Sequence, residues 1–133
     1  MKWNYLFLLM FVLVGCKKGS NNEPQYYVKY VIDGGSSIQQ VNNTGLKITL
    51  TNEKNTSVDY IRSNRGSNEF TIGPVKKGFI SSVSATNVCC ALCCYIRPTL
   101  QIYLSENNGA FVLKKEDLST QLRDAAQISF TIE

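Results

Sequence analysis

Apolar and polar residues alternate along most of the chain after residue 25. Successive side chains of a β-strand point to opposite faces, so this alternation allows one face of each strand to be buried. The segment LKITLT shows the pattern most clearly, because Leu46, Ile48 and Leu50 share one face. Segments of the same kind lie at 25–33, 46–51, 57–62, 69–72, 79–88, 99–105, 110–115 and 127–133. The pattern predicts about seven or eight short strands.

Residues that favour turns separate the predicted strands. Gly34-Gly35, Gly73-Pro74 and Asn107-Asn108-Gly109 each interrupt the alternation. The last of these predicts a hairpin over residues 99–115. Short strands at regular intervals, in a chain of 133 residues, favour an all-β fold. We predict an antiparallel β-sandwich of immunoglobulin-like size.

Two further predictions concern the connections between strands. The segments 57–62 and 69–72 are expected to pair across the polar loop between them. Residues 117–126 are expected to form one or two helical turns. Leu118 and Leu122 stand four apart there, after an aspartate of the kind that favours the start of a helix.

The first residues have the organisation of a secretory signal. Lys2 supplies a positive charge, Leu6 to Val14 form an apolar run, and the small Gly15 precedes Cys16. The run is nine residues long, which is too short for a helix that must cross about 30 Å of hydrocarbon. The pattern predicts a signal peptide over residues 1–15 rather than a membrane span.

The sequence Leu13-Val14-Gly15-Cys16 resembles the lipobox of bacterial lipoproteins. This resemblance implies that the signal is cut before Cys16, whose sulfur then carries a lipid. Several acyl chains make a lasting anchor, because each buried methylene contributes about 0.8 kcal/mol. Residues 16–25 are then a lipidated flexible tether, rich in Gly, Ser, Asn and Pro, and residues 26–133 the domain.

Lys17 stands where an Asp often signals inner-membrane retention in this class, so the resemblance implies the outer membrane, on its periplasmic or its surface face. The stretches YYVKYVID, ITLTNEKN, FTIGPVKKGFISSVSATN and TLQIYLSENNGAFVLKKE resemble small β-sandwich lipoproteins of Bacteroidetes-type bacteria. They are also faintly similar to the C-terminal domain of the mycobacterial transport-accessory lipoproteins called MmpS. Both resemblances imply a small β-sandwich on an envelope anchor, and neither brings catalytic residues.

Four cysteines lie within six residues, at Cys89, Cys90, Cys93 and Cys94. Export to an oxidising compartment favours disulfides over free thiols. If residues 88–95 turn a hairpin, Cys90 faces Cys93 and Cys89 faces Cys94, at separations that suit disulfides. We expect structural disulfides in this segment.

Two alternatives remain for the four clustered cysteines. A tetrahedral zinc site needs separated ligand pairs that wrap the ion, whereas these sulfurs all come from one short segment. A redox role would use Cys90-Ala91-Leu92-Cys93, but such motifs obtain a depressed thiol pKa largely from a helix N-terminus, and the flanking sequence here resembles strands.

Other residue types narrow the range of functions. The chain has no histidine, the commonest general acid–base and metal ligand, and its net charge of +4 is too dispersed for a nucleic-acid interface. Two sets of carboxylates are expected to be surface charges rather than glycosidase or calcium sites: Glu116, Asp117 and Asp124, and Asp33, Glu53 and Asp59. An aromatic binding patch is an alternative to ordinary strand packing for Tyr26, Tyr27, Tyr30, Tyr60 and Tyr103.

These observations lead us to expect a non-enzymatic, lipid-anchored envelope protein that binds a ligand or supports a neighbouring complex. Its expected partners are the membrane, through the lipid, and an envelope protein or a glycan. No cofactor and no nucleic acid are expected. The alternative function is that of a thiol or metal-binding envelope protein that uses the four clustered cysteines.

Overall fold

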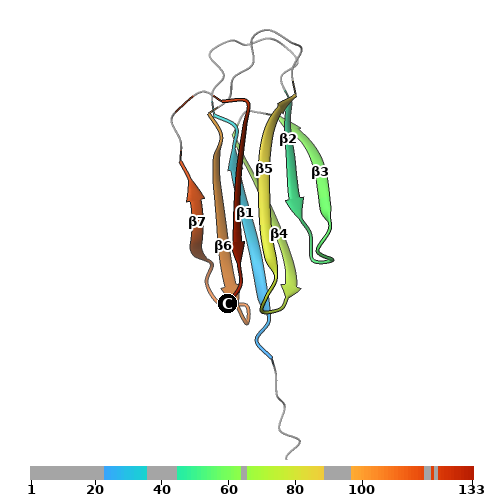
Figure 1. Cartoon of the computed structure of the whole chain (residues 1–133). Coiled ribbons are helices and arrows are strands. Elements are labelled where there is room, and N and C mark those ends of the chain that lie inside the picture. The colour runs from blue at the N-terminus through green and yellow to red at the C-terminus, as the bar shows by residue number, and fades with distance from the viewer. Residues whose placement is uncertain (1–22, 36–44, 64–65, 89–96, 119–120, 122) are drawn as a thin grey trace, which may run out of the picture.

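Eight antiparallel strands form two four-stranded sheets in the computed structural model, which describes residues 23–35, 45–63, 66–88, 97–118, 121 and 123–133 (Figure 1). The first sheet has the order β4 (Ser67–Val75), β1 (Tyr26–Asp33), β6 (Thr99–Glu106) and β7 (Val112–Asp117). The second sheet has the order β3 (Ser57–Ser63), β2 (Gly45–Thr51), β5 (Ile80–Val88) and β8 (Ala125–Thr131). The predicted all-β sandwich is confirmed.

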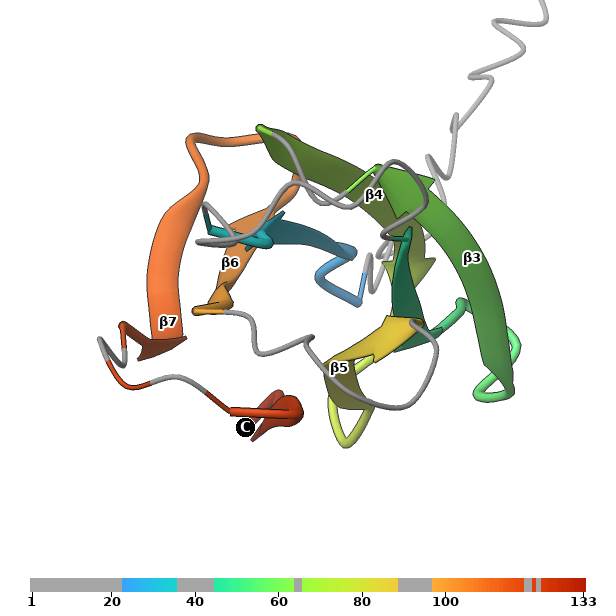
Figure 2. The ribbon, with the colours of Figure 1, turned by 90° about the horizontal axis from the view of Figure 1, so that it is seen from above.

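The core lies between the two sheets, as the view along the strands shows (Figure 2). Alternate residues of β1, β2 and β6 are buried, as the sequence pattern predicts. The fully buried large side chains are Val28, Tyr30, Ile32, Leu46, Ile48, Leu50, Val83, Pro98, Leu100, Ile102 and Ile132. Because apolar burial is the main favourable term in folding, this layer accounts for most of the stability.

The predicted pairing of 57–62 with 69–72 is wrong, because the two segments belong to different sheets. β3 pairs with β2, and β4 pairs with β1. The turn between β2 and β3 explains the first pairing: the Asn52 side chain accepts hydrogen bonds from the backbone N–H groups of Lys54 and Thr56, at 3.0 and 3.1 Å. This compact turn joins β3 to β2 directly. The predicted hairpin over 99–115 is confirmed, since β6 pairs with β7.

The predicted helical turns over 117–126 are also wrong in the described residues of that segment. Strand β7 continues to Asp117, and β8 begins at Ala125, which pairs with Thr86 of β5. Leu118 is 52% exposed, so it does not contribute to a buried helical face. Two leucines give a weak helical preference, and pairing along β5 overrides it.

The two ends of the sandwich, which we call the tether end and the distal end, contain different turns and strand ends. The tether end comprises residues 23–25 and the turns at 52–56, 76–79 and 107–111, whereas the distal end comprises the opposite strand ends, among them Val88 and Thr99 (Figure 1). β1 leaves the tether end and runs to the distal end, because Tyr26 pairs with Glu106 and Asp33 pairs with Thr99. The described N-terminal segment and the strand end at Val88 are therefore at opposite ends.

Removing the Tyr30 hydroxyl is expected to weaken the contact between the sheets. This hydroxyl, on β1, donates a 3.0 Å hydrogen bond to the backbone carbonyl of Thr51 at the end of β2. Tyr30→Phe should lower the free energy of unfolding by about 1–2 kcal/mol, since the carbonyl loses its partner inside the protein. Urea unfolding measures the change. The matched control is Tyr103→Phe, whose hydroxyl is on the outer face of the first sheet; an equal loss in the control would contradict the account.

Tyr30 also makes the free energy of unfolding depend on pH in the alkaline range. Burial raises the pKa of Tyr30 above its ordinary value of 10.0. Above pH 10.0 the unfolded chain therefore releases this proton while the folded protein keeps it, so the free energy of unfolding falls as the pH rises. Below that pH the contribution is fully present. In Tyr30→Phe this part of the alkaline decline should be absent.

Candidate functional site

The outer face of the first sheet presents aromatic and apolar side chains beside a few polar groups. Tyr27, Lys29 and Val31 alternate with the buried positions of β1, and Gln101 and Tyr103 do so in β6. One row of this surface runs through Lys29, Tyr103 and Leu113, and the next through Val31, Gln101 and Glu116, as the strand register places them. We call the surface formed by Tyr27, Lys29, Val31, Gln101, Tyr103, Phe111, Leu113 and Glu116 the aromatic face.

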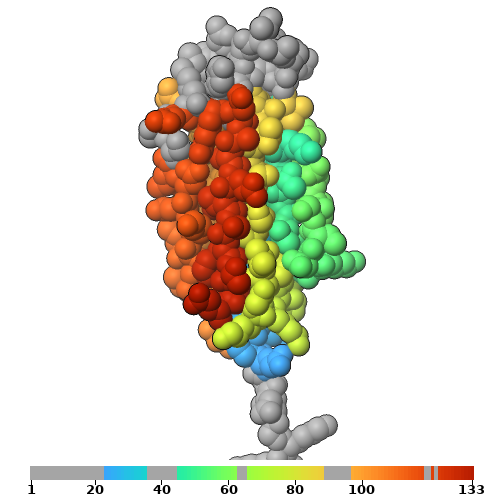
Figure 3. All heavy atoms as spheres, in the orientation of Figure 1, coloured from blue at the N-terminus to red at the C-terminus, as the bar shows by residue number. Residues whose placement is uncertain are grey.

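The outer face of the second sheet has a different character. The space-filling view shows it over β8, β5, β2 and β3 (Figure 3). Its outward positions are mostly small hydroxyl or amide residues: Thr49, Thr51, Ser82, Ser84, Thr86, Gln127, Ser129 and Thr131. A Lys47–Asp59 ion pair at 2.8 Å also lies there. The hydrogen bonds from Lys47 and Thr49 hold the pKa of the exposed Asp59 below its ordinary value.

Lys29 lies between two aromatic rings on the aromatic face. Its Nζ is 5.0 Å from the centroid of the Tyr103 ring and 5.2 Å from that of Phe111. Ammonium groups at such distances are attracted to the ring faces, by about 0.5–1 kcal/mol at exposed sites. Among the described carboxylates, none forms an ion pair with Lys29. The two rings, rather than an acidic side chain, therefore hold the Lys29 ammonium group.

A tight turn brings Phe111 to this position. Asn107 and Asn108 adopt positive φ angles of 50° and 61°, and the Gly109 N–H donates to the Glu106 carbonyl at 2.8 Å. The Ser105 hydroxyl donates to the Gly109 carbonyl at 2.7 Å. The turn leads through Phe111 into β7, and Phe111 and Leu113 are 37% and 40% exposed.

Hydrogen bonds connect the polar side chains of the aromatic face. The Tyr103 hydroxyl donates to Gln101 Oε1 at 3.2 Å, and Gln101 Nε2 donates to Glu116 Oε2 at 3.3 Å. In the part of the chain that the structure describes, Glu116 Oε1 accepts no hydrogen bond. One acceptor on Glu116 and one N–H of Gln101 are thus offered to solvent beside the rings.

The structure divides the five tyrosines for which an aromatic patch was an alternative to ordinary strand packing. Tyr26 and Tyr30 belong to the core, and Tyr60 packs against Phe70 at a centroid distance of 4.7 Å. Tyr27 lies over Gly73, where an added Cβ would be 2.8 Å from its Cδ1 atom. Only Tyr27 and Tyr103 of the five lie on the aromatic face. Lys29, Phe111 and Leu113 were not predicted as site residues.

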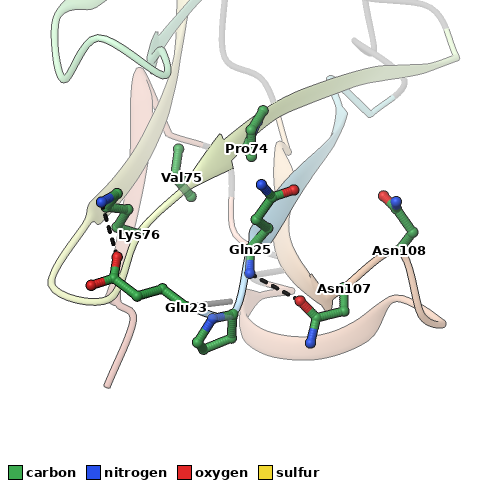
Figure 4. A pocket seen from close by; sticks show the side chains of 8 residues that line it. Glu23, Gln25, Pro74, Val75, Lys76, Asn107 and Asn108 are labelled. Carbon is green, nitrogen blue, oxygen red and sulfur yellow. Dashed lines mark hydrogen bonds and ion pairs between the residues drawn. The ribbon is translucent and has the colours of Figure 1, made fainter. Parts of the chain in front are cut away.

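A second surface feature is a hollow of about 670 Å³ at the tether end, lined by Glu23, Pro24, Gln25, Pro74, Val75, Lys76, Asn107 and Asn108 (Figure 4). Gln25 N–H donates to Asn107 Oδ1 at 3.0 Å, and the Asn107 N–H donates to the Gln25 carbonyl at 2.8 Å. Lys76 forms an ion pair with Glu23 at 2.9 Å, and its hydrogen bond lowers the pKa of the exposed Glu23. These contacts attach the start of the domain to the sandwich.

The predicted cysteine sites cannot be placed in this geometry. Cys16, Cys89, Cys90, Cys93 and Cys94 lie outside the described residues. The residues that flank the cluster in sequence, Val88 and Arg97, are described, and Val88 ends β5 at the distal end. The disulfide, zinc and redox hypotheses thus stay predictions.

Several of the carboxylates that were considered as glycosidase or calcium sites take part in separate ion pairs and hydrogen bonds. Asp117 pairs with Arg123 at 2.8 Å, Glu116 accepts from Gln101, and Asp33 Oδ1 accepts from the Gly35 N–H at 2.8 Å. In the described ranges, no three metal-ligating side chains of the His, Cys, Asp and Glu types form a group that could hold an ion. The same ranges contain no helix with the length and apolar character needed to cross a bilayer.

No protein-family model matches this chain, and no curated protein does.

Proposed function

We propose that this protein is a non-enzymatic, lipid-anchored protein of the cell envelope, which acts as a binding or accessory module. The observation that carries the proposal is the sequence Leu13-Val14-Gly15-Cys16 at the end of an apolar run, with Cys16 ten residues before the start of β1. This order of signal, acylation site, tether and domain is that of an exported lipoprotein. The β-sandwich is the module that the anchor holds at the membrane.

The contacts of residues 23–25 at the tether end support this order of anchor, tether and domain. Residues 23–25 are attached there by the Glu23–Lys76 ion pair and by the paired hydrogen bonds between Gln25 and Asn107. The chain from Cys16 to Glu23 can reach at most about 25 Å, even if fully extended. A lipid on Cys16 would therefore keep the tether end close to the bilayer. The distal end would face away from it, and the aromatic face would stand roughly along the membrane normal.

Replacing the acylation site tests the proposal. In cells that express the full chain and are supplied with a labelled fatty acid, the wild-type protein should carry the label and sediment with the membranes. Cys16→Ala should carry no label and should appear in the soluble fraction, because its sulfur is the attachment point. Gly15→Ala is the matched control, since it keeps a small residue before the cysteine and should remain labelled. Labelled, membrane-bound Cys16→Ala would refute the proposal.

A further inference from the structure

We propose that the aromatic face binds an uncharged oligosaccharide along the β6–β7 edge of the first sheet. The site residues are Phe111 and Leu113, which pack against the sugar, and Lys29, Gln101 and Glu116, which hydrogen-bond its hydroxyl groups. The proposal names a ligand class for the binding function proposed above. It rests on that proposed function, because the cell envelope is where the protein would meet the sugar. It does not depend on the lipid itself.

The shape of the site follows from the strand register. Leu113 and Glu116 lie along the outer side of β7, opposite Tyr103 and Gln101 of β6, and Phe111 directly precedes β7. The register shift matches three steps of β7 to two of β6, so the distance from residue 111 to residue 116 is about 13 Å at the usual rise of a strand. A surface of this length suits a short chain of sugars better than a single sugar. It is open rather than enclosed, so long polymers can also lie across it.

The chemistry of the site matches the two kinds of surface on a sugar ring. A pyranose has C–H groups on its faces, which pack on apolar and aromatic side chains, and hydroxyl groups around its edge. Phe111 and Leu113 offer the first kind of contact, with 37% and 40% of their surfaces exposed. Lys29 and Gln101 offer donors, and Glu116 Oε1 offers an acceptor. Apolar side chains beside a few placed polar groups are also the combination that small-ligand sites use.

The polar groups are held in place before any ligand arrives. Tyr103 orients the Gln101 amide, and Gln101 in turn holds Glu116. The rings of Tyr103 and Phe111 hold the Lys29 ammonium between them. Side chains that are already ordered lose less conformational entropy on binding. The hydrogen-bonded groups are therefore better suited to a ligand than unconnected surface residues are.

The charges favour a neutral ligand. Lys29 and Glu116, the two charged members of the aromatic face, carry opposite charges, so this pair gives no preference for an anionic or a cationic ligand. An extended peptide is also disfavoured, because it would add to the free edge of β7. The β6–β7 register is shifted between Ile102 and Tyr103, and such irregularities oppose strand addition at an edge.

Saturation-transfer NMR on the full chain purified from the envelope fraction tests the inference. The probes are cellohexaose, xylohexaose, mannohexaose and chitohexaose, each at about 10 mM, a concentration that reveals weak binding. We expect transfer to the C–H protons of at least one probe. Phe111→Ala should weaken its binding about tenfold or more, and Gln101→Ala about threefold or more, on the scale of one lost ring contact or one lost hydrogen bond. The control Ile61→Ala, at a 59% exposed residue of β3, should bind as the wild type does.

Three outcomes would overturn the inference. The first is no transfer to any of the four probes. The second is binding that neither Phe111→Ala nor Gln101→Ala weakens. The third is binding of hexagalacturonate, an anionic probe, in preference to all neutral ones. Cys16→Ala is run in the same assay. Because this variant has no acylation site, its sugar binding is measured independently of the lipid, and a failure of acylation can be distinguished from a failure of sugar binding.

Discussion

Ile48→Ala is expected to lower the free energy of unfolding by about 2–5 kcal/mol, the range measured when a buried isoleucine or leucine is truncated. Ile48 is fully buried in β2 and faces the core between the two sheets. β2 pairs with β3 on one side and β5 on the other, where Tyr60 and Ala85 are opposite Ile48. Backbone hydrogen bonds on both sides limit how far the strands can move, so the cavity left by the missing atoms stays open. Urea unfolding followed by far-ultraviolet circular dichroism measures the loss.

The same substitution one strand away is the control for Ile48→Ala. Ile61 lies in β3 with 59% of its surface exposed, so Ile61→Ala removes the same atoms from a site in contact with water. It should cost less than about 1 kcal/mol, which is the span of strand preferences. If Ile61→Ala destabilised the protein as much as Ile48→Ala, the assignment of the core would be wrong.

Gly73→Ala is expected to destabilise the protein by about 2–4 kcal/mol, because two costs act together. Gly73 has a φ angle of +134°, a region that residues with a Cβ rarely adopt. An added Cβ would also lie 2.8 Å from the Tyr26 carbonyl oxygen and 2.8 Å from Cδ1 of Tyr27. The carbonyl belongs to the central strand β1, so it cannot move without disturbing the sheet. Urea unfolding measures the change in the free energy of unfolding.

A second glycine separates the two costs at Gly73. Gly66 also has a positive φ angle, +76°, but an added Cβ would meet no atom of the described residues within 4 Å. Gly66→Ala should therefore show only the backbone cost, about 1–2 kcal/mol. Equal losses in both variants would mean that Tyr26 and Tyr27 do not crowd this position.

The strands could be predicted from the sequence because their alternation is local. Leu46, Ile48 and Leu50 mark their own strand, and the Asn107-Asn108-Gly109 turn fixes the partner of β6. The partners of β3 and β4 could not be predicted in the same way. Both segments are short and amphipathic, so either pairing would bury their apolar sides. For β3 the compact Asn52 turn favours the neighbouring strand β2, whereas β4 pairs with β1, a strand far away in the sequence.

The aromatic face could be predicted only in part. The sequence indicates that Tyr103 alternates with the buried residues of its strand, and the Asn-Gly turn brings Leu113 beside it. The position of Lys29 depends on the pairing of β1 with β6, which no local signal reports. Phe111 precedes β7, and its ring reaches Lys29 through the conformation of the turn. A sequence search for aromatic residues next to a strong hairpin turn would have identified Phe111.

We propose that residue 16 carries a lipid that holds the chain outside the reducing cytosol. Cys89, Cys90, Cys93 and Cys94 are expected to form disulfides in that compartment. The most direct measurement is the intact mass of the protein isolated from membranes with free thiols blocked by an alkylating reagent. We expect a chain that begins at Cys16, carries a diacylglyceryl group and has no alkylated cysteine. An unprocessed chain that begins at Met1, recovered from the cytosol with all five cysteines alkylated, would contradict it.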